Sequence, residues 1–461
     1  MTQTVVESTV SERPDVFPAS PKKSTPALSP QVAELMKKES EYIVGGFTPL
    51  PAYITGGQGS TLRSIDGKEY IDFIAMFSAG SLGQCHPKLV EAITSTAQTS
   101  TIVNTSLRVA SWPTFAEMMC RRFGYDKINA AVTGSEAADT AVKIARKWGR
   151  QVKGISADKM LVLGVGDNYH GLLSGIWPIM NPDVERDAYG VFDDKLTNVH
   201  PVKRTILRYG HIEDMEDCLA EHHGDVAAII MECIHGHLPT FDQDKQYARK
   251  VALLCKKYNI LFISDEIRMG AGKTGRFLCS DWLGDDIKPD IITIGKSITG
   301  GAYPAAFVLG NNETMSLVKP YQCAGTFAQT PMAIACTTAA LKIIDEEGLV
   351  ARAAKIQDQF LEYTKDWVQK FAFIEFVTAR GADFNITLKS DYHNPLVTAR
   401  RFAALAMHKG LVTYPLEGRI RMSIAMTIPD EALQRGFEIL RETAEEIEQY
   451  EEIAGGVHET E

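Results

Sequence analysis

The sequence lacks three features that would tie it to a membrane, to nucleic acid or to an oxidising compartment. No apolar run approaches the ~18–20 residues that a membrane-spanning helix requires. No cluster of basic residues is present, and a net charge of −10 argues against a nucleic-acid or anionic-membrane partner. The eight cysteines are spread singly with no C-x-x-C pair, which favours free thiols in a reducing compartment over disulfides or a metal site.

Residues 1–30 also lack what a targeting signal needs. They are rich in Ser, Thr and Pro and contain no apolar core of the kind found in a secretory signal. Their acidic residues and scarce arginines fit a mitochondrial presequence poorly. We therefore expect a disordered tail over residues 1–30 and a cytoplasmic protein.

The remaining sequence has the pattern of an α/β protein with more than one domain. Between about residues 112 and 345, short apolar runs that do not alternate with polar residues are separated by amphipathic stretches. Such strands, separated by helices, indicate a mostly parallel sheet covered on both faces. From about residue 346 onward the chain is richer in helix and charge, which indicates a second, smaller domain. The runs predicted as strands are 160–165, 226–232, 260–264, 291–295 and 305–310, with a further pair at 410–415 and 419–425.

Two charged residues stand where two of the apolar runs end. Lys296 follows the run 291–295, although lysines ordinarily lie on solvated faces. Parallel sheets bind ligands at their carboxyl edge, and a partly desolvated amine there is a nucleophile for a Schiff base. Asp265 ends the run 260–264 and is placed to keep a pyridine nitrogen protonated. The alternatives are a lysine that turns to solvent and an aspartate that caps the next turn.

A phosphate site is predicted where an amphipathic helix begins after a capping box of the form Thr-x-x-Glu at residue 133. The free N–H groups of Gly134 and Ser135 and the positive end of the helix suit a phosphate, and the alternative is a plain helix cap. Tyr169 and His170, in the loop after the run 160–165, are candidates for stacking on an aromatic ring or for ordinary loop packing.

In this order, these segments resemble the class III aminotransferases of pyridoxal 5′-phosphate (PLP) fold type I, and within them the ornithine aminotransferases. The resemblance implies PLP as cofactor and a homodimer with its active sites at the subunit interface. It also implies a large domain with a mostly parallel seven-stranded sheet between helices, and a smaller α+β domain from both chain ends. We expect the small domain over 31–80 and 346–461 and the large domain over 81–345. The matching stretches are 66–92, 133–149, 168–171, 265–277, 289–304, 325–331 and 419–428.

The resemblance further implies roles for individual residues. Lys296 would form the Schiff base with PLP and shuttle the proton, and Asp265 would pair with the pyridine nitrogen. Ile267 and Tyr169 would lie on the two faces of the ring. Gly134 and Ser135 would hold the phosphate, and Thr326 would reach it from the neighbouring subunit.

On the substrate side the sequence departs from the ornithine aminotransferases at three positions. Phe47 and Phe77 replace two tyrosines, and Leu172 replaces an arginine. These changes remove two hydroxyls and a cation and leave a more apolar pocket. A site that hydrogen-bonds its substrate loses ~10⁴ or more in discrimination when such partners vanish. We therefore expect that ornithine is not the substrate.

Two further changes bear on the mechanism. His237 stands where the resemblance implies a glutamate that masks a carboxylate-binding arginine, and that arginine is Arg421. We expect the unmasked Arg421 to grip an α-carboxylate in a bidentate pair, so that chemistry occurs at the α-carbon. Arg268 replaces a glutamine that bonds the 3-oxygen of the cofactor. It either stabilises the phenolate there or points at an acidic neighbour.

The function favoured is a PLP-dependent aminotransferase that acts on an amino acid with a 2-oxo acid as amino acceptor. A racemase, a decarboxylase or an elimination/replacement lyase at the α-carbon is the alternative, because PLP supports all of these reactions. A catalytically inactive scaffold is disfavoured by the presence of both Lys296 and Asp265.

Overall fold

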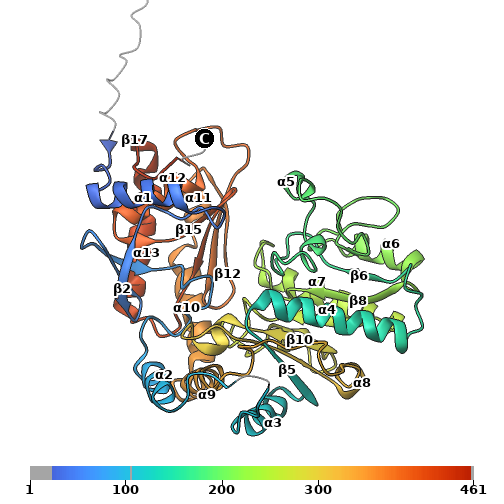
Figure 1. The fold of residues 1–461 in the computed structure, drawn as a ribbon. Coiled ribbons are helices and arrows are strands. Elements are labelled where there is room, and N and C mark those ends of the chain that lie inside the picture. The colour runs from blue at the N-terminus through green and yellow to red at the C-terminus, as the bar shows by residue number, and fades with distance from the viewer. Residues whose placement is uncertain (1–22, 104–105, 458–461) are drawn as a thin grey trace, which may run out of the picture.

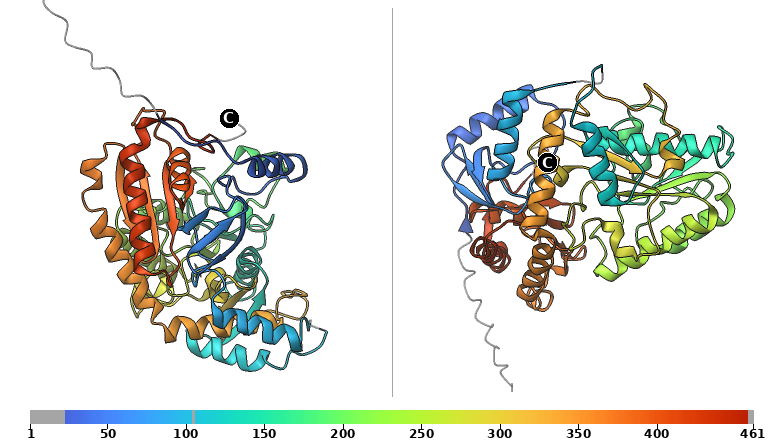
Figure 2. Two further views of the ribbon diagram at one scale, coloured as in Figure 1. Left: turned by 90° about the vertical axis from the view of Figure 1, so that its left-hand side faces the viewer. Right: turned by 90° about the horizontal axis from the view of Figure 1, so that it is seen from below.

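The structure, a computed structural model, describes residues 23–103 and 106–457 and has two lobes (Figure 1). One lobe is built around a seven-stranded sheet. The other contains two four-stranded sheets and both ends of the described chain (Figure 2). No helix in the described ranges combines the length and apolar character needed to span a bilayer.

The seven-stranded sheet confirms the α/β fold with a mostly parallel sheet. Its order is β5-β11-β10-β9-β8-β6-β7, and only β11 runs antiparallel to its neighbours. The strands are β5 (Lys127–Ala131), β6 (Leu161–Leu163), β7 (Leu196–Thr197), β8 (Val226–Met231), β9 (Leu261–Asp265), β10 (Ile291–Ile294) and β11 (Ala306–Gly310).

Helices cover both faces of this sheet, which explains the uninterrupted apolar runs. Every residue of β8, β9 and β10 is buried. Side chains on one face pack with α4 (Gly134–Gln151), and those on the other face pack with α6 (Ile212–His222) and α7 (Phe241–Tyr258). The five strands predicted in this region are all present. The sequence did not predict β5 and β7, because β5 is a half-exposed edge strand and β7 has only two residues.

The second lobe joins the two ends of the chain, because β14 pairs in parallel with β4. Its sheets have the orders β14-β4-β3-β2 and β12-β13-β16-β15, and the predicted strand pair near residue 420 is the β15–β16 hairpin. The exact domain boundaries stay a prediction. The strands are β2 (Ile54–Gln58), β3 (Thr61–Ser64), β4 (Glu69–Asp72), β12 (Ile374–Ala379), β13 (Asp383–Leu388), β14 (Leu411–Val412), β15 (Tyr414–Leu416) and β16 (Arg419–Ser423).

The expected N-terminal tail falls largely outside the described residues, which begin at Lys23. From there β1 (Lys23–Ser24) pairs with β17 (Tyr450–Glu452), so the end of the expected tail is held against the second lobe. The other helices are α1 (Pro30–Tyr42), α2 (Pro87–Thr99), α3 (Trp112–Phe123), α5 (Val184–Asp187), α8 (Asn312–Met315), α9 (Pro331–Glu346), α10 (Leu349–Tyr363), α11 (Trp367–Lys370), α12 (Ala399–His408) and α13 (Asp430–Glu446).

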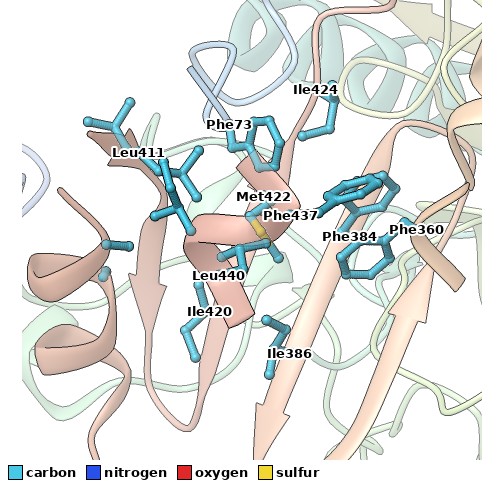
Figure 3. Packing of buried hydrophobic residues seen from close by; sticks show 14 of the residues in the cluster. Phe73, Phe360, Phe384, Ile386, Leu411, Ile420, Met422, Ile424, Phe437 and Leu440 are labelled. Atoms are coloured by element: carbon cyan, nitrogen blue, oxygen red, sulfur yellow. The ribbon is translucent and has the colours of Figure 1, made fainter. Parts of the chain in front are cut away.

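Four buried phenylalanines hold the second lobe together (Figure 3). Phe360 of α10 stacks on Phe384 of β13 with ring centroids 3.9 Å apart, and Phe437 of α13 lies 5.5 Å from Phe360. Phe73, directly after β4, meets Phe437 edge to face at 6.2 Å. This core fixes β13 and its neighbour β16, which carry residues that face the first lobe.

We expect Phe384→Ala to destabilise the protein by about 3–5 kcal/mol, because a fully buried aromatic ring leaves a cavity that its neighbours fill only in part. The measurement is the thermal unfolding midpoint. Tyr42→Ala is the matched control, since that ring is 82% exposed. An equal loss for the two variants would contradict the assignment of this core.

Candidate active site

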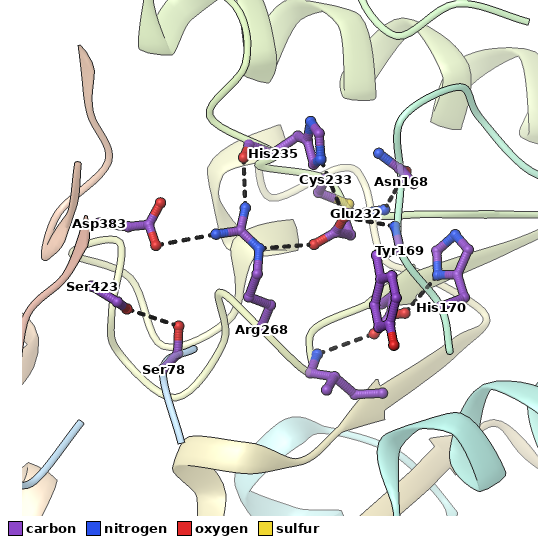
Figure 4. Close-up of polar contacts among 12 residues, drawn as sticks. Ser78, Asn168, Tyr169, His170, Glu232, Cys233, His235, Arg268, Asp383 and Ser423 are labelled. Atoms are coloured by element: carbon purple, nitrogen blue, oxygen red, sulfur yellow. Dashed lines mark hydrogen bonds and ion pairs between the residues drawn. The ribbon is translucent and has the colours of Figure 1, made fainter. Parts of the chain in front are cut away.

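Lys296 lies at the carboxyl edge of the large sheet, two residues beyond the end of β10. Its φ of +46° is uncommon for a residue with a side chain, and it starts a short 3₁₀ turn over Lys296–Thr299. The hydroxyl of Ser297 donates a hydrogen bond to the backbone oxygen of Ser78, which fastens this turn to the second lobe. Ser78 in turn meets Ser423 of β16, with 3.1 Å between the two hydroxyl oxygens (Figure 4).

The electrostatic surroundings of Lys296 favour its neutral amine. Burial and the nearby guanidinium groups of Arg268 and Arg421 lower the pKa of Lys296 to about 8, although Glu232 and Asp265 act in the opposite direction. A larger fraction of the amine is therefore unprotonated near neutral pH than in an exposed lysine. This is the form that attacks a carbonyl carbon.

Asp265 is the last residue of β9, next to Thr293 of β10 in the strand register. One carboxylate oxygen accepts hydrogen bonds from the Thr293 hydroxyl at 3.0 Å and from the Ile267 N–H at 3.1 Å. The other lies 2.6 Å from Nδ1 of His170. Three partners thus fix a carboxylate that is only 3% exposed. Nε2 of His170 is buried with no hydrogen-bond partner among the described residues.

The predicted capping box is present at the start of α4. Thr133 and Glu136 exchange side-chain to backbone hydrogen bonds at 3.2 and 2.9 Å. The N–H groups of Gly134 and Ser135 have no acceptor in the described part of the chain. They remain available for an anion at the positive end of the helix.

Three segments pack around the start of α4, and two glycines permit the contact. A Cβ atom on Gly134 would lie 2.9 Å from the Ile267 side chain, and one on Gly171 would lie 2.0 Å from Oγ of Ser135. Tyr169 and His170 directly precede Gly171 in the same loop, and each contacts an acid outside it. The Tyr169 N–H donates to Glu232 at 3.2 Å, and its ring is 47% exposed (Figure 4).

Arg268 is held between the two lobes by buried acids (Figure 4). Its guanidinium donates to Glu232 at 3.1 Å, to Asp383 of β13 at 3.1 Å and to the backbone oxygen of His235 at 2.6 Å. Burial opposes its charge, but Asp383 and Glu232 outweigh that effect and raise the pKa of Arg268. This geometry favours the alternative in which Arg268 points at acidic neighbours.

Arg421, on β16, has no hydrogen-bond acceptor or ion-pair partner among the described residues. Ile420 and Met422 on either side of it are fully buried in the lobe core, so Arg421 lies on the opposite face of the strand. It lines a pocket together with Arg268 and Asp383. Burial and the neighbouring Arg268 lower the pKa of Arg421 to about 10, so its guanidinium is still charged at neutral pH.

Two of the replaced substrate-side residues, Phe47 and Phe77, form an apolar surface beside this pocket. Phe77 lines the pocket, and its ring centroid is 5.1 Å from that of Phe47. Leu172 is 56% exposed. The ring centroid of His237 is 3.5 Å from that of His235. Burial, His235 and the nearby arginines lower the pKa of His237, so its ring is neutral beside Arg421. Thr326 lies in an exposed segment.

Three site residues were missed by the sequence analysis. Glu232 directly follows β8, much as Asp265 ends β9. A charged residue at the end of a buried apolar run was the pattern that indicated Asp265, and the same pattern indicates Glu232. Asp383 and Tyr414 come from strands of the second lobe, and Tyr414 lies directly opposite Arg421 in the β15–β16 ladder. Nothing in the local sequence indicates that these strands face the large sheet.

Comparisons with known proteins agree with the expected resemblance. The family model described as "Aminotransferase class-III" matches residues 44–444. The ornithine aminotransferase of Schizosaccharomyces pombe is 33% identical over 417 residues, which covers 89% of this chain and 92% of the relative. That of Saccharomyces cerevisiae is 34% identical over 407 residues, or 87% and 95%. A crystal structure of the Toxoplasma gondii ornithine aminotransferase matches with a TM-score of 0.82 at 26% identity, over 91% of this chain and 96% of that chain.

PLP fits the arrangement of groups in this site. A second Toxoplasma gondii ornithine aminotransferase structure, with a TM-score of 0.83 and 27% identity over 91% of this chain and 95% of that chain, has PLP at partial occupancy in its active site. In the present chain the partly buried amine of Lys296 suits the aldehyde of PLP, and the fixed carboxylate of Asp265 suits its ring nitrogen. The free N–H groups of Gly134 and Ser135 suit its phosphate.

We expect the rate at which the cofactor-free protein takes up PLP to rise with pH and to level off above about pH 8. The reason is that Lys296 attacks as the neutral amine, which predominates above its pKa. The measurement is the growth of visible absorbance after mixing at a series of pH values, with Lys296→Ala as the control that forms no covalent adduct. A rise that continues to about pH 10.4, the ordinary pKa of lysine, would contradict the lowered value.

Proposed function

The chain belongs to the class-III aminotransferases, a PLP-dependent family, and we propose that it transfers an amino group between the α-carbon of an amino acid and a 2-oxo acid. We further propose that ornithine is not its preferred amino donor. The observation that carries the proposal is the charged guanidinium of Arg421, which lines the pocket and forms no ion pair among the described residues, because the acid beside it, Asp383, is paired with Arg268.

A guanidinium in this state is suited to an α-carboxylate. Its planar fork forms two parallel hydrogen bonds with a carboxylate, and partial burial strengthens them. Lys296 lies close enough to Arg421 for the guanidinium to lower its pKa. A carboxylate bound to Arg421 would therefore hold the adjacent α-carbon near the lysine amine.

The neighbouring residues divide the remaining tasks. When bound, PLP supplies a protonated ring that accepts electrons from the substrate's α-carbon. Lys296 would hold the cofactor's aldehyde carbon and move the proton at the α-carbon, and Asp265 would keep the ring nitrogen protonated. Ile267 and Tyr169 would contact the two ring faces, with His170 orienting Asp265.

The phosphate would be held by Gly134 and Ser135, with Thr326 contributed by a second copy of the chain. The exposed segment around Thr326 supports a homodimer. Two aromatic residues in this segment, Tyr321 and Phe327, are 101% and 52% exposed, and a second subunit would cover them. We propose a cytoplasmic location, supported by the free state of all eight cysteines.

The rejection of ornithine rests on the apolar residues around the pocket. Phe47, Phe77 and Leu172 offer no group that would hydrogen-bond the second amine of ornithine. Burial of that amine without a partner is costly. Because His237 has no carboxylate that could pair with Arg421, the guanidinium stays available in both halves of the reaction, first for the amino acid and then for the 2-oxo acid.

We expect Arg421→Ala to lower kcat/KM for amino-acid donors by at least about 30-fold, because it removes a buried charge that pairs with the carboxylate. Arg421→Lys keeps the positive charge but loses the planar guanidinium, so its kcat/KM should lie between that of the unmodified enzyme and that of Arg421→Ala. The control substrate is an amine with the same side chain but no carboxylate, which the substitution should affect little. Unchanged turnover and affinity in Arg421→Ala would contradict the proposal.

Product analysis by mass spectrometry tests the reaction type. With a panel of amino acids, we expect the donor to become its 2-oxo acid in multiple turnovers only when 2-oxoglutarate or another 2-oxo acid is added. Ornithine should be among the poor donors. Turnover that is equally fast without any 2-oxo acid would instead indicate racemisation, decarboxylation or elimination.

A further inference from the structure

Three aromatic rings from three separate segments pack together beside Arg421, and two of them, Phe77 and Tyr414, line the pocket. Tyr414 of β15 meets Phe77 edge to face with centroids 4.6 Å apart. Phe47 lies 5.1 Å from Phe77 and 6.4 Å from Tyr414, again edge to face in the second case. We call Phe47, Phe77 and Tyr414 the aromatic wall.

Strand pairing places this wall next to the carboxylate-binding group. Tyr414 and Arg421 are directly opposite each other in the antiparallel β15–β16 ladder, so their side chains lie on the same face of the sheet. Both line the pocket, and so does Phe77. A ligand whose carboxylate reaches Arg421 therefore has its side chain within reach of the rings.

The backbone at Phe77 is held in an unfavourable conformation, which indicates a functional constraint on its position. Four consecutive residues, 75–78, have φ between +40° and +78°, and none is glycine. Each such residue costs roughly 1 kcal/mol or more, and strain of this kind collects at ligand sites. The turn is held by Asp72, whose carboxylate accepts from the N–H groups of Ile74 and Ala75 at 2.8 Å.

We propose that the aromatic wall is the side-chain subsite of the active site, that Tyr414 is a specificity-determining residue, and that the preferred donor is an α-amino acid with a large apolar side chain. This inference rests on the proposed function. Burying such a side chain against ring faces removes apolar surface from water, and the rings present no charge that would bind an ionic side chain.

Arg419 is the feature that would favour an acidic side chain instead. It lies two residues from Arg421 on the same face of β16 and forms no hydrogen bond or ion pair within the described residues. However, it is opposite Leu416 and does not line the pocket, and the acid nearby that acts on it is Asp167. The donor's side chain meets the aromatic wall before it reaches Arg419.

The first test measures a single half-reaction, so that no choice of acceptor enters. The PLP-loaded enzyme is mixed with alanine, leucine, phenylalanine, glutamate or ornithine, and the decay of its visible absorbance is followed. Leucine or phenylalanine should react at least about tenfold faster than alanine at low concentration, as expected for a well-filled apolar pocket. Tyr414→Ala should abolish most of this ratio of the leucine or phenylalanine rate to the alanine rate.

Tyr414→Phe is the matched control, because it keeps the ring and removes only a hydroxyl that has no partner among the described residues. It should retain the preference for large apolar donors. Phe47→Ala is a second variant at a ring that is 61% exposed, where the substitution leaves little cavity in the fold. Phe47→Ala should also reduce the ratio of the leucine or phenylalanine rate to the alanine rate, and it replaces Tyr414→Ala in the test if that variant is unstable.

The second test measures binding of unreactive carboxylates by titration calorimetry. We expect 3-phenylpropanoate to bind at least about tenfold more tightly than propanoate or glutarate, and Tyr414→Ala to remove that advantage. Preference for glutamate and glutarate, lost in Arg419→Ala, would overturn the inference. So would a preference for phenylalanine that is unaffected by both wall variants. If the carboxylates bind as expected but no amino acid reacts, the proposed function fails while the subsite stands.

Discussion

The arrangement of charges in this site depends on one buried guanidinium shared between two acids. Arg268 satisfies Glu232 after β8 of the large sheet and Asp383 of β13 in the second lobe, so it ties the lobes together across the cleft. Removal of one member would leave the others as uncompensated buried charges, which is far more destabilising than loss of a surface pair. Because both acids are engaged with Arg268, Arg421 is left without an anion of its own.

The same constraint explains how nearby groups of like charge take different roles. The charge of Arg268 is neutralised by its acid partners, whereas Arg421 is charged and lines the pocket. Burial and both guanidinium groups lower the pKa of Lys296 and so favour its neutral amine. Asp265, which also acts on Lys296, is oriented by partners of its own, Thr293 and His170. In the proposed function these four charged groups would serve as a tie, an anion receptor, a nucleophile and a ring-nitrogen partner.

The sequence predicted those parts of the site that follow buried strands. Lys296 and Asp265 stand out because a charge at the end of an apolar run is unusual, and the capping box at Thr133 is a local pattern. The partners of Arg268 were left open, because Asp383 lies 115 residues away in the chain and no local rule brings it near. Tyr414 was missed for a similar reason, because its place in the site follows from its cross-strand neighbour, Arg421, and not from its own segment.

Two serine contacts described above join parts of the site that are distant in the chain. Ser78 follows Phe77 in the strained turn and accepts a hydrogen bond from Ser297, the residue next to Lys296. Its hydroxyl lies 3.1 Å from that of Ser423, on the strand that carries Arg421. These contacts join the three parts into one connected unit. An evolving enzyme of this shape would change its substrate by exchanging side chains on that unit, since a shift of any one segment would displace the other two.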